Sequence, residues 1–512
     1  MTAISTAIGI ERISRIVGYK VKPVNFTPDT PYLPQRIAFF GEANTANQAT
    51  MTKDVPFEFI SADEVGEEFG YGCPLHIMAR IARPASGNIL GGIPTVIYPQ
   101  ESDVGATPTI IKMGVAVATT VTENVTHELL INGRDNIDGS RYAFSLVKGE
   151  NQAAVTAKII AAINAVLQAP VVASASTLDI DFTTKWEGVT SKELNIVVET
   201  NGIAAGVVYS EVSKSDGGGV VSLAATLVNF AESWNTLVVN PYADQLETLE
   251  DFNGVPDPDN PTGRYAPELF KPFVALFGSV LSDKDDVVAI TNASARKTQV
   301  TNALCPAPLS TGFTFEAAAN MVTSYGAIAQ NSPHIDNSGK TYPDMPVPSD
   351  ELIGDFSDYN ARDFMVKKGA STVNITNGKY TIQDFITTYV PDGVTIPKFR
   401  FVKDLNIDFN MEFGWRIIMI NDIQDKTIIA DGESTNVANT ISPKQVLQLV
   451  SSHINLAVSR ALIVDAAFSI ASALAGINAT NPARLDIFFR YKRSSTAHIV
   501  SSDVEVDFNY TT

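Results

Sequence analysis

The sequence predicts a multidomain protein of mixed α/β and α+β class, with an α/β core, a small inserted α+β domain, and extended N- and C-terminal arms. Three observations lead to this prediction. The 512 residues exceed what one hydrophobic core usually organises. A composition of 45% hydrophobic and 18% charged residues supplies ample core material. Strand-like and helix-like apolar patterns alternate through the middle, whereas proline-rich and alternating segments lie near the ends.

Residues 1–35 are predicted to form an extended N-terminal arm. Apolar residues there alternate with small or basic ones, which indicates a strand. The strand residues are Val17, Tyr19, Lys20, Val21 and Lys22. Four prolines follow between Pro23 and Pro34. Because proline fixes φ and donates no backbone hydrogen bond, we expect this stretch to be stiff and extended.

An α/β domain is predicted from two separated segments, residues 36–107 and 211–395. Strand patterns alternate with helix patterns in both, which is typical of a sheet covered by helices. The expected strands are residues 36–41, 93–98, 236–239 and 286–290. The expected helices are residues 63–69, closed by Gly70, and residues 315–329.

Residues 108–210 are predicted to form the small inserted α+β domain. The expected order is strand, turn, strand, helix and three further strands. The strands are residues 126–131, 141–147, 171–175, 177–182 and 194–199, with the turn at Asn132-Gly133 and the helix over residues 151–167.

Residues 396–512 are predicted to form a C-terminal domain, whose main element is a long helix over residues 443–475. Ser442 and Gln445 have the spacing of a capping box at its start. An apolar stripe at helical spacing continues along the segment. Gly476 is expected to end the helix.

The end of the sequence predicts a strand with one apolar and one acidic face. Its alternating residues are Asp503, Val504, Glu505, Val506, Asp507 and Phe508. Such a strand fits two arrangements. It is either the edge of a sheet in its own domain, or a strand donated to a neighbouring molecule through main-chain hydrogen bonds.

Charge and cysteine content exclude several classes of function. The net charge of −19 argues against direct nucleic-acid binding, which needs cations to displace the counterions of phosphate. The two distant cysteines exclude a disulfide framework and a four-cysteine zinc site, and they indicate a reducing compartment. The sequence has no basic start followed by an apolar run, and no stretch of 18 apolar residues. We therefore expect neither a secretory signal nor membrane insertion.

Motifs that would support catalysis are incomplete, so we predict no enzyme activity, catalytic residue, cofactor or metal. Gly339-Lys340-Thr341 matches the end of a phosphate-binding loop, but His334 occupies the position where that loop needs glycine. The five histidines are scattered and lack the i, i+4 spacing of a zinc site. The acidic segments 257–260 and 283–286 lack the spacing of a calcium-binding loop.

A small basic cluster stands out in this acidic chain. It consists of Arg490, Lys492 and Arg493. The cluster fits either a solvated strand face or a contact with an acidic partner surface.

Three groups of residues, in order, resemble contractile tail sheath proteins of the Mu-like phage family. Residues 129–133, 163–165, 170–175, 185–188 and 193–196 are similar to the inserted domain of that family. Residues 360–364, 369–372 and 386–389, which end in Thr-Thr-Tyr, are similar to a second family segment. The third group is residues 481–486, followed by the terminal strand.

This resemblance implies a structural subunit of the virion tail sheath, assembled in the host bacterial cytoplasm. Copies would form a helical polymer of stacked rings around a tail tube, and contraction would drive that tube through the host envelope. The implied partners are other copies, the tail tube protein, and baseplate and tail terminator proteins. The two terminal strands become candidate intersubunit arms, and the basic cluster a possible tube contact. The alternatives are a tailocin-like injection system or another virion tail or baseplate protein.

Overall fold

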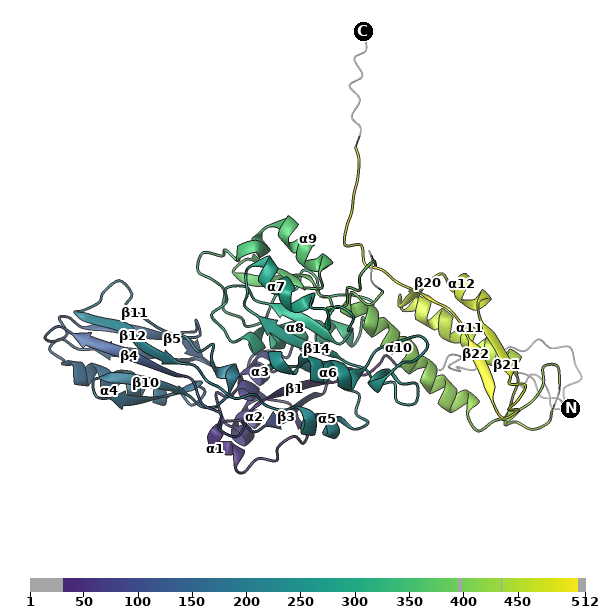
Figure 1. Cartoon of the computed structure of the whole chain (residues 1–512), viewed down its shortest axis with the longest axis horizontal. Coiled ribbons are helices and arrows are strands. Elements are labelled where there is room, and N and C mark those ends of the chain that lie inside the picture. The colour runs from purple at the N-terminus through teal and green to yellow at the C-terminus, as the bar shows by residue number, and fades with distance from the viewer. Residues whose placement is uncertain (1–30, 395–397, 434, 505–512) are drawn as a thin grey trace, which may run out of the picture. The chain divides into compact units, whose positions relative to one another are not determined.

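The computed structural model describes residues 31–394, 398–433 and 435–504 (Figure 1). The chain divides into two compact units, which we describe separately. Phe413–Ser459 and Asp465–Lys492 belong to the smaller unit. Leu33–Glu412, Arg460–Val464 and the chain from Arg493 onward belong to the larger unit. The mixed α/β and α+β class is confirmed by the elements of both.

A six-stranded sheet lies at the centre of the larger unit, in the order β15-β14-β13-β1-β3-β2. The strands are β1 (Ile37–Glu42), β2 (Phe57–Phe59), β3 (Thr95–Gln100), β13 (Leu237–Val239), β14 (Val274–Ser279) and β15 (Asn302–Pro306). All neighbours pair in parallel except β2 and β3. Every residue of β1 and β3 is buried, as expected for a parallel sheet covered on both faces.

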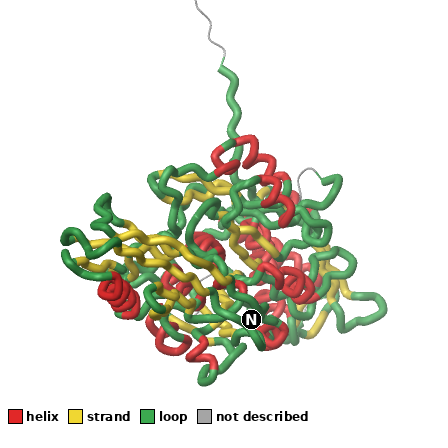
Figure 2. The backbone as a smooth tube through the Cα atoms, turned by 60° about the vertical axis from the view of Figure 1, so that its left-hand side comes forward, coloured by secondary structure: helices red, strands yellow, loops and turns green. Residues whose placement is uncertain are grey.

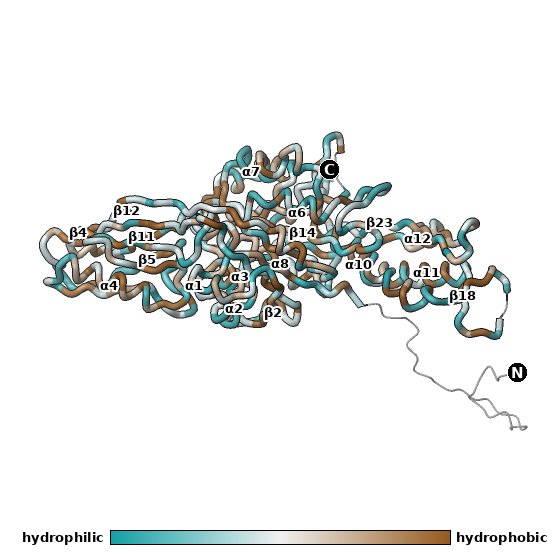
Figure 3. The backbone as a smooth tube through the Cα atoms, turned by 60° about the horizontal axis from the view of Figure 1, so that its bottom comes forward, coloured by the Kyte–Doolittle hydropathy of each residue, from teal (hydrophilic) through white to brown (hydrophobic). Residues whose placement is uncertain are grey.

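Helices lie around this sheet, and several of them complete its core. They are α1 (Thr45–Gln48), α2 (Ala62–Phe69), α3 (Pro74–Ala82), α5 (Ala224–Phe230), α6 (Leu246–Asn253), α7 (Lys284–Thr291) and α8 (Thr314–Ala329). Helix α8 packs on β13, β14, β15 and α3. Phe40, Tyr98 and Phe230 lie in one cluster with ring centroids 4.7–5.9 Å apart. Figure 3 shows hydrophobic chain gathered around β14, α8 and α3.

Several further elements of the larger unit follow α8 in the chain. They are α9 (Tyr359–Lys367), the antiparallel pair β16 (Thr372–Thr376) and β17 (Lys379–Asp384), and the start of α10 (Val402–Ile418). Short 3-10 helices occur at Val189–Ser191, Ala243–Gln245, Gly263–Tyr265 and Gly354–Ser357. The short strands β20 (Ile463–Val464) and β23 (Lys492–Arg493) come late in the chain. None of the helices in the described ranges is both long and apolar enough to cross a membrane.

Two antiparallel sheets, a short hairpin and one α-helix form the region over residues 110–215 (Figure 2). The first sheet has the order β12-β4-β10-β9, from β4 (Ile110–Val117), β9 (Val171–Ser176), β10 (Asp179–Thr184) and β12 (Val207–Ser215). The second has the order β11-β5-β8, from β5 (Val125–Ile131), β8 (Ala143–Leu146) and β11 (Ile196–Glu199). The other elements are the hairpin β6 (Asn136–Ile137) and β7 (Ser140–Arg141), and helix α4 (Gln152–Asn164). The strands expected over residues 126–131, 171–175, 177–182 and 194–199 are present, whereas β4 and β12 were not expected from the sequence.

The predicted strand over residues 286–290 is wrong, because this segment belongs to helix α7. The β-branched Val287, Val288 and Ile290 favoured a strand, but the helix cap decides the outcome. Asp283 accepts hydrogen bonds from the backbone N–H groups of Asp285 and Asp286. These two bonds lower the pKa of Asp283 and fix a helix start.

The long C-terminal helix is predicted correctly at its start and wrongly beyond Ser459. The capping box is confirmed, since Gln445 Oε1 accepts from the Ser442 N–H at 2.8 Å and Ser442 Oγ accepts from the Gln445 N–H at 3.4 Å. Helix α11 ends at Ser459, and left-handed backbone follows at Ala461 (φ 56°) and Asp465 (φ 61°). A left-handed residue cannot continue a right-handed helix, so the apolar stripe is divided between separate elements.

The smaller unit is built around α11 (Pro443–Ser459). It also contains α12 (Ala466–Ala471), the antiparallel hairpin β21 (Leu474–Ile477) and β22 (Leu485–Phe488), the parallel pair β18 (Thr427–Ile428) and β19 (Thr440–Ile441), and a π-helical turn at Met419–Ile423. Gly476, expected to end the helix, lies inside β21. The rings of Trp415, His453 and Phe489 pack together with centroids 5.5–6.4 Å apart.

Candidate assembly site

Within the described residues, the hairpin β21–β22 is a two-stranded sheet whose two edges are unpaired. Leu474 pairs with Phe488, and Ile477 with Leu485. Among the residues that the structure describes, no third strand pairs with this sheet. Each edge therefore presents unpaired backbone N–H and C=O groups, which can accept a strand from another chain. Two strands alone are only marginally stable in water, so such a sheet gains from extension.

One face of the hairpin exposes two apolar side chains, Leu474 and Phe488, next to Gly476 and the charged Asp486. Leu474 and Phe488 lie opposite each other, so their side chains share one face. Their exposed fractions are 65% and 49%. Ala475 and Ile487 point to the other face and are partly buried, and β21 packs against α11. The outward face is therefore available for apolar contacts with a partner.

The turn of the hairpin is held by polar contacts among residues 478–486. Asn478 Oδ1 accepts from the backbone N–H groups of Thr480 and Asn481, each at 3.0 Å. Asn478 Nδ2 and Arg484 Nε both donate to the Asp486 carboxylate, at 2.7 and 2.5 Å. These two bonds lower the pKa of Asp486. The segment 481–486, which carries part of the family resemblance, thus forms the turn and the start of β22.

The terminal strands expected from the sequence lie largely outside the described residues. This holds for Val17, Tyr19, Lys20, Val21 and Lys22, and for Glu505, Val506, Asp507 and Phe508. Asp503 and Val504 are described; both are exposed, and neither is paired in a strand. Their extended path ends the described chain (Figure 1).

The three basic residues of the cluster are held in different ways. Arg493 donates to both carboxylate oxygens of Asp408, at 2.7 and 2.6 Å. Lys492 Nζ lies 2.6 Å from Asp465 Oδ2, which lowers the pKa of that carboxyl. Arg490 is exposed, and its guanidinium carbon lies 5.4 Å from the centre of the Phe488 ring. Arg490 is therefore the member placed beside the exposed Phe488 side chain of the hairpin.

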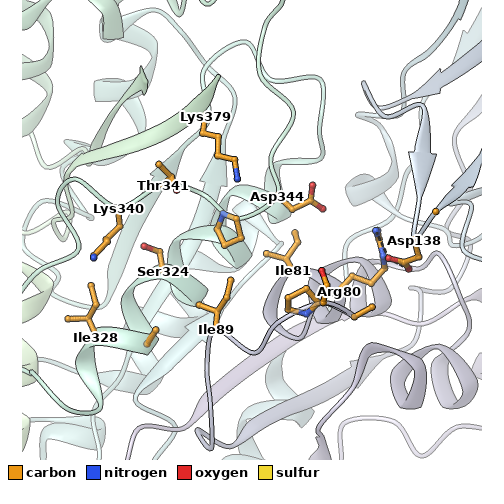
Figure 4. A pocket seen from close by; sticks show the side chains of 16 residues that line it. Arg80, Ile81, Ile89, Asp138, Ser324, Ile328, Lys340, Thr341, Asp344 and Lys379 are labelled. Carbon is orange, nitrogen blue, oxygen red and sulfur yellow. Dashed lines mark hydrogen bonds and ion pairs between the residues drawn. The ribbon is translucent and has the colours of Figure 1, made fainter. Parts of the chain in front are cut away.

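The Gly339-Lys340-Thr341 segment is a loop attached to β17. The Gly339 N–H donates to the Ile382 carbonyl, and the Tyr342 N–H to the Tyr380 carbonyl. The backbone that would surround a phosphate in a phosphate-binding loop is thus used to extend a sheet. Figure 4 shows Lys340 and Thr341 at the wall of a pocket.

That pocket has a volume of about 870 Å³ and carries charges of both signs. Its charged residues are Arg80, Asp138, Lys340, Asp344 and Lys379. Arg80 is paired with Asp138 through two hydrogen bonds at 2.9 and 3.2 Å (Figure 4). Throughout the described residues, no group of three or more His, Cys, Asp or Glu side chains is placed to hold a metal ion.

Buried polar contacts between distant segments are the feature that sequence reasoning missed. Arg134, after β5, pairs with the buried Glu316 of α8 at 2.5 Å. The neighbouring Thr314 N–H donates to Glu193 Oε2 at 2.6 Å. These contacts join the β4–β12 region to the α/β core. The local sequence carries no signal for them, because each partner is ordinary in its own segment.

A second buried contact lies where β1 ends. Glu42 is fully buried, and its Oε1 accepts from the Thr190 hydroxyl at 3.0 Å. Thr190 in turn accepts from the Trp186 indole at 3.0 Å. Burial raises the pKa of Glu42 to about 7, although hydrogen bonds from its own backbone, Thr190 and Tyr242 oppose that rise.

Three solved structures are similar to this chain at low sequence identity. The sheath tail protein of Desulfitobacterium hafniense shows 9% identity and a TM-score of 0.44, over 94% of this chain and 100% of that chain. A chain of the anti-feeding prophage baseplate shows 11% identity and a TM-score of 0.45, over 97% and 100%. A chain of the contracted sheath complex of the extracellular contractile injection system PVC shows 8% identity and a TM-score of 0.44, over 97% and 99%.

No family model matches the chain, and no curated protein matches its sequence. Because the TM-scores of the similar structures lie below 0.5, we base the functional proposal on the residues of this chain.

Proposed function

We propose that this protein is the structural subunit of a contractile tail sheath. Copies polymerise into stacked rings around a tail tube, and their rearrangement shortens the sheath and drives the tube through the host envelope. The observation that carries the proposal is the hairpin β21–β22, whose edges pair with no other described strand, in a chain whose ends carry strand patterns. The same chain thus holds a strand acceptor and strands to donate.

Strand addition would join neighbouring subunits through the hairpin. A donated strand forms main-chain hydrogen bonds with an open edge, and its apolar side chains cover the face of Leu474 and Phe488. The alternation of Val504, Val506 and Phe508 presents one apolar face for this contact. A sheet of two strands would become one of three or four, which is more stable.

Charge would set the register and choice of partner. The acidic face of the donated strand carries Asp503, Glu505 and Asp507. Arg490 lies beside the acceptor face, and Lys20 and Lys22 lie in the N-terminal strand pattern. Opposite charges across such a sheet contribute about 0.2–1 kcal/mol for each pair, repeated at every joint. Main-chain hydrogen bonds supply most of the free energy of association, and the charges favour one strand register over the others.

A contractile sheath must have an extended and a shortened arrangement of its subunits, and the joints between subunits must persist in both. Joints made by extended strands meet this need, because the compact parts of the subunits can move while the strands stay paired. The energy comes from the lattice contacts, so the proposal includes no chemical step, nucleotide or metal. The partners would be other copies of the chain, the tail tube protein, and baseplate and terminator proteins of a virion tail.

A tailocin-like contractile injection system would use the same subunit chemistry and is the nearest alternative. The two roles differ in whether a genome-filled head is attached, which the surrounding genes would reveal. Another virion tail or baseplate protein is a further alternative. It would bind other tail components without forming long tubes by itself.

Negative-stain electron microscopy of the purified protein over a concentration series tests the proposal. We expect hollow helical tubes above a critical concentration, and loss of the tubes after deletion of residues 503–512 or 1–22. Circular dichroism melting of each variant controls for misfolding. Monodisperse monomers at every concentration, with and without these segments, would refute the sheath role.

A further inference from the structure

His498 attaches the C-terminal segment to the body of the larger unit. Its Nε2 lies 3.0 Å from Asp336 Oδ2, and its ring stacks on Phe401 with centroids 4.7 Å apart and planes 17° apart. Beyond it, Ile499 and Val500 are each 85% exposed. In the described part of the chain, no hydrogen bond or ion pair involves residues 499–504.

Asp336, the partner of His498, is held in place by its own loop. Asp336 is buried, and its Oδ1 accepts from the Ser338 N–H at 3.0 Å. Ser338 Oγ donates to the Gln383 carbonyl at 2.8 Å, and the Gly339 N–H donates to the Ile382 carbonyl at 2.8 Å. The loop around Asp336 is therefore fixed to β17, so a side chain bound to Asp336 is fixed as well.

The charges around His498 favour an ion pair. The hydrogen bond to Asp336 raises the pKa of His498 above its ordinary 6.5; Asp384 adds to the rise, while burial and Lys403 oppose it. Burial alone would raise the pKa of Asp336, but the bonds from His498 and the Ser338 N–H lower it. Lys403 is itself paired with Asp404 at 2.7 Å. The contact is thus an imidazolium–carboxylate pair below the raised pKa of His498.

We propose that His498 and Asp336 form a releasable clasp that sets the free length of the C-terminal strand, and so which neighbouring subunit the strand can reach. The proposal rests on the proposed function, because it assumes that residues 503–508 are donated. Neither residue belongs to the acceptor hairpin. Their role is to position the donated strand.

The chain length makes this effect large. Asp503 follows His498 by five residues, so with the clasp closed the donated strand begins within about 17 Å of His498, at about 3.3 Å per residue. The preceding anchored residue in the described chain is Ser494, whose N–H donates to the Leu462 carbonyl at 3.0 Å. With the clasp open, Asp503 lies nine residues from that anchor and reaches about 30 Å. Release of one ion pair nearly doubles the reach.

This arrangement suits a joint that must hold while subunits move. A short free segment restricts the strand to a near acceptor and keeps its effective concentration high. When the subunits separate, tension acts on His498, and the clasp can yield before the donated strand leaves its sheet. The four residues 495–498 then provide the additional length.

Spin labels on the full-length monomer test the clasp without any assembly. Cys73 and Cys305 are buried, so a label at Ala497→Cys or Ser501→Cys reports one site. We expect the label at 497 to be restricted and the label at 501 to be mobile. Asp336→Asn should make the label at 497 as mobile as the one at 501. Equal mobility in the unaltered background, or no response to Asp336→Asn, would overturn the clasp.

The pH dependence gives a second readout on the same labelled protein. The pKa of His498 is raised above its ordinary 6.5 by the contact with Asp336. The contact is therefore at full strength below pH 6.5 and weakens as the pH rises through the raised pKa. Asp336, whose pKa is lowered, contributes above its ordinary 3.8. The label at 497 should therefore be most restricted between about pH 4 and 6.5 and become more mobile above 6.5. A pH-independent spectrum would contradict the ion pair.

Deletion of two residues tests the reach in tubes. Removing Val500 and Ser501 keeps the alternation of strand faces and shortens the free segment by about 7 Å. We expect this deletion to abolish tubes, and Asp336→Asn added to it to restore them. Tubes from the deletion alone, or no rescue, would overturn the role in reach. Absence of tubes from the unaltered protein would instead refute the sheath role, while the spin-label result would still decide the clasp.

Discussion

The six-stranded sheet and the hairpin β21–β22 use the same backbone chemistry but differ in how far the chain completes them. Strands β1 and β3 are buried along their whole length and paired on both sides. The hairpin pairs with no further strand among the described residues, and its Leu474 and Phe488 side chains are exposed. The first sheet provides the stability of one subunit, whereas the second leaves hydrogen bonds for a neighbour. Substitutions in the two sheets should therefore affect folding and assembly separately.

The largest effect is expected from the core of the six-stranded sheet. Phe230 is fully buried against Phe40 and Tyr98, so Phe230→Ala removes apolar contacts and leaves a cavity. We expect the free energy of unfolding to fall by about 3–5 kcal/mol. Urea unfolding followed by circular dichroism measures it, with Leu474→Ala as the exposed control. Equal losses for both variants would contradict the division of roles.

Glu42, at the end of β1, should give this core a pH-dependent stability. Its pKa is raised from 4.5 to about 7, so the folded state favours the protonated carboxyl. This stabilisation is complete below about pH 4.5 and is lost as the pH rises to about 7, a change of about 3 kcal/mol.

Comparison of Glu42→Gln with the unaltered protein isolates this contribution. The glutamine cannot ionise, so the variant should gain relative stability of about 2–3 kcal/mol between pH 5 and pH 8. Urea unfolding at both pH values measures the difference. Burial also raises the pKa of Glu250 to about 7, but that residue is present in both proteins and cancels. Parallel pH profiles would show that Glu42 does not titrate in this range.

The hairpin should respond in assembly and not in folding. Leu474 is 65% exposed, so Leu474→Asp should change the free energy of unfolding by only about 0.5 kcal/mol. In the polymer it would place a charge on the covered face, opposite an acidic strand. We expect the critical concentration for tubes to rise at least about tenfold, or about 1.4 kcal/mol.

Val104→Asp is the matched control for the hairpin variant, because Val104 is 99% exposed in a loop of the larger unit. It adds the same charge without touching the hairpin. Pelleting of tubes over a concentration series compares the two. If both variants assemble alike, the hairpin is not the acceptor.

Local signals in the sequence predicted local structure well. The capping box at Ser442 and Gln445 is formed as expected, and the strand around Phe39 is buried as its apolar run indicated. The errors arose where one local signal opposed another. At residues 286–290 the β-branched residues predicted a strand, but the Asp283 cap starts a helix there. Beyond Ser459 the apolar periodicity predicted a continuous helix, but left-handed backbone interrupts it.

The candidate site was predictable only in part. The alternating residues at the ends predict strands, because alternation is a local pattern, but they lie largely outside the described residues and their donation stays a proposal. The hairpin β21–β22 was not predicted, because the apolar periodicity indicated a helix that continues through Leu474 and ends at Gly476. The contacts of His498 with Asp336 and of Arg134 with Glu316 join segments far apart in the chain, so they follow from the fold and not from any motif.

The smallest effect is expected from the charges of the N-terminal strand. Lys20→Glu together with Lys22→Glu would replace attraction to the acidic terminal strand by repulsion, at about 0.2–1 kcal/mol for each pair. The critical concentration for tubes should rise a few-fold at low salt, and the difference should shrink as salt screens the charges. The paired charge exchange, with Asp503→Lys and Glu505→Lys added, should recover assembly, because it restores opposite charges across the joint. Unchanged assembly at low salt, with a folded monomer, would show that main-chain bonds and apolar contacts set the register without these pairs.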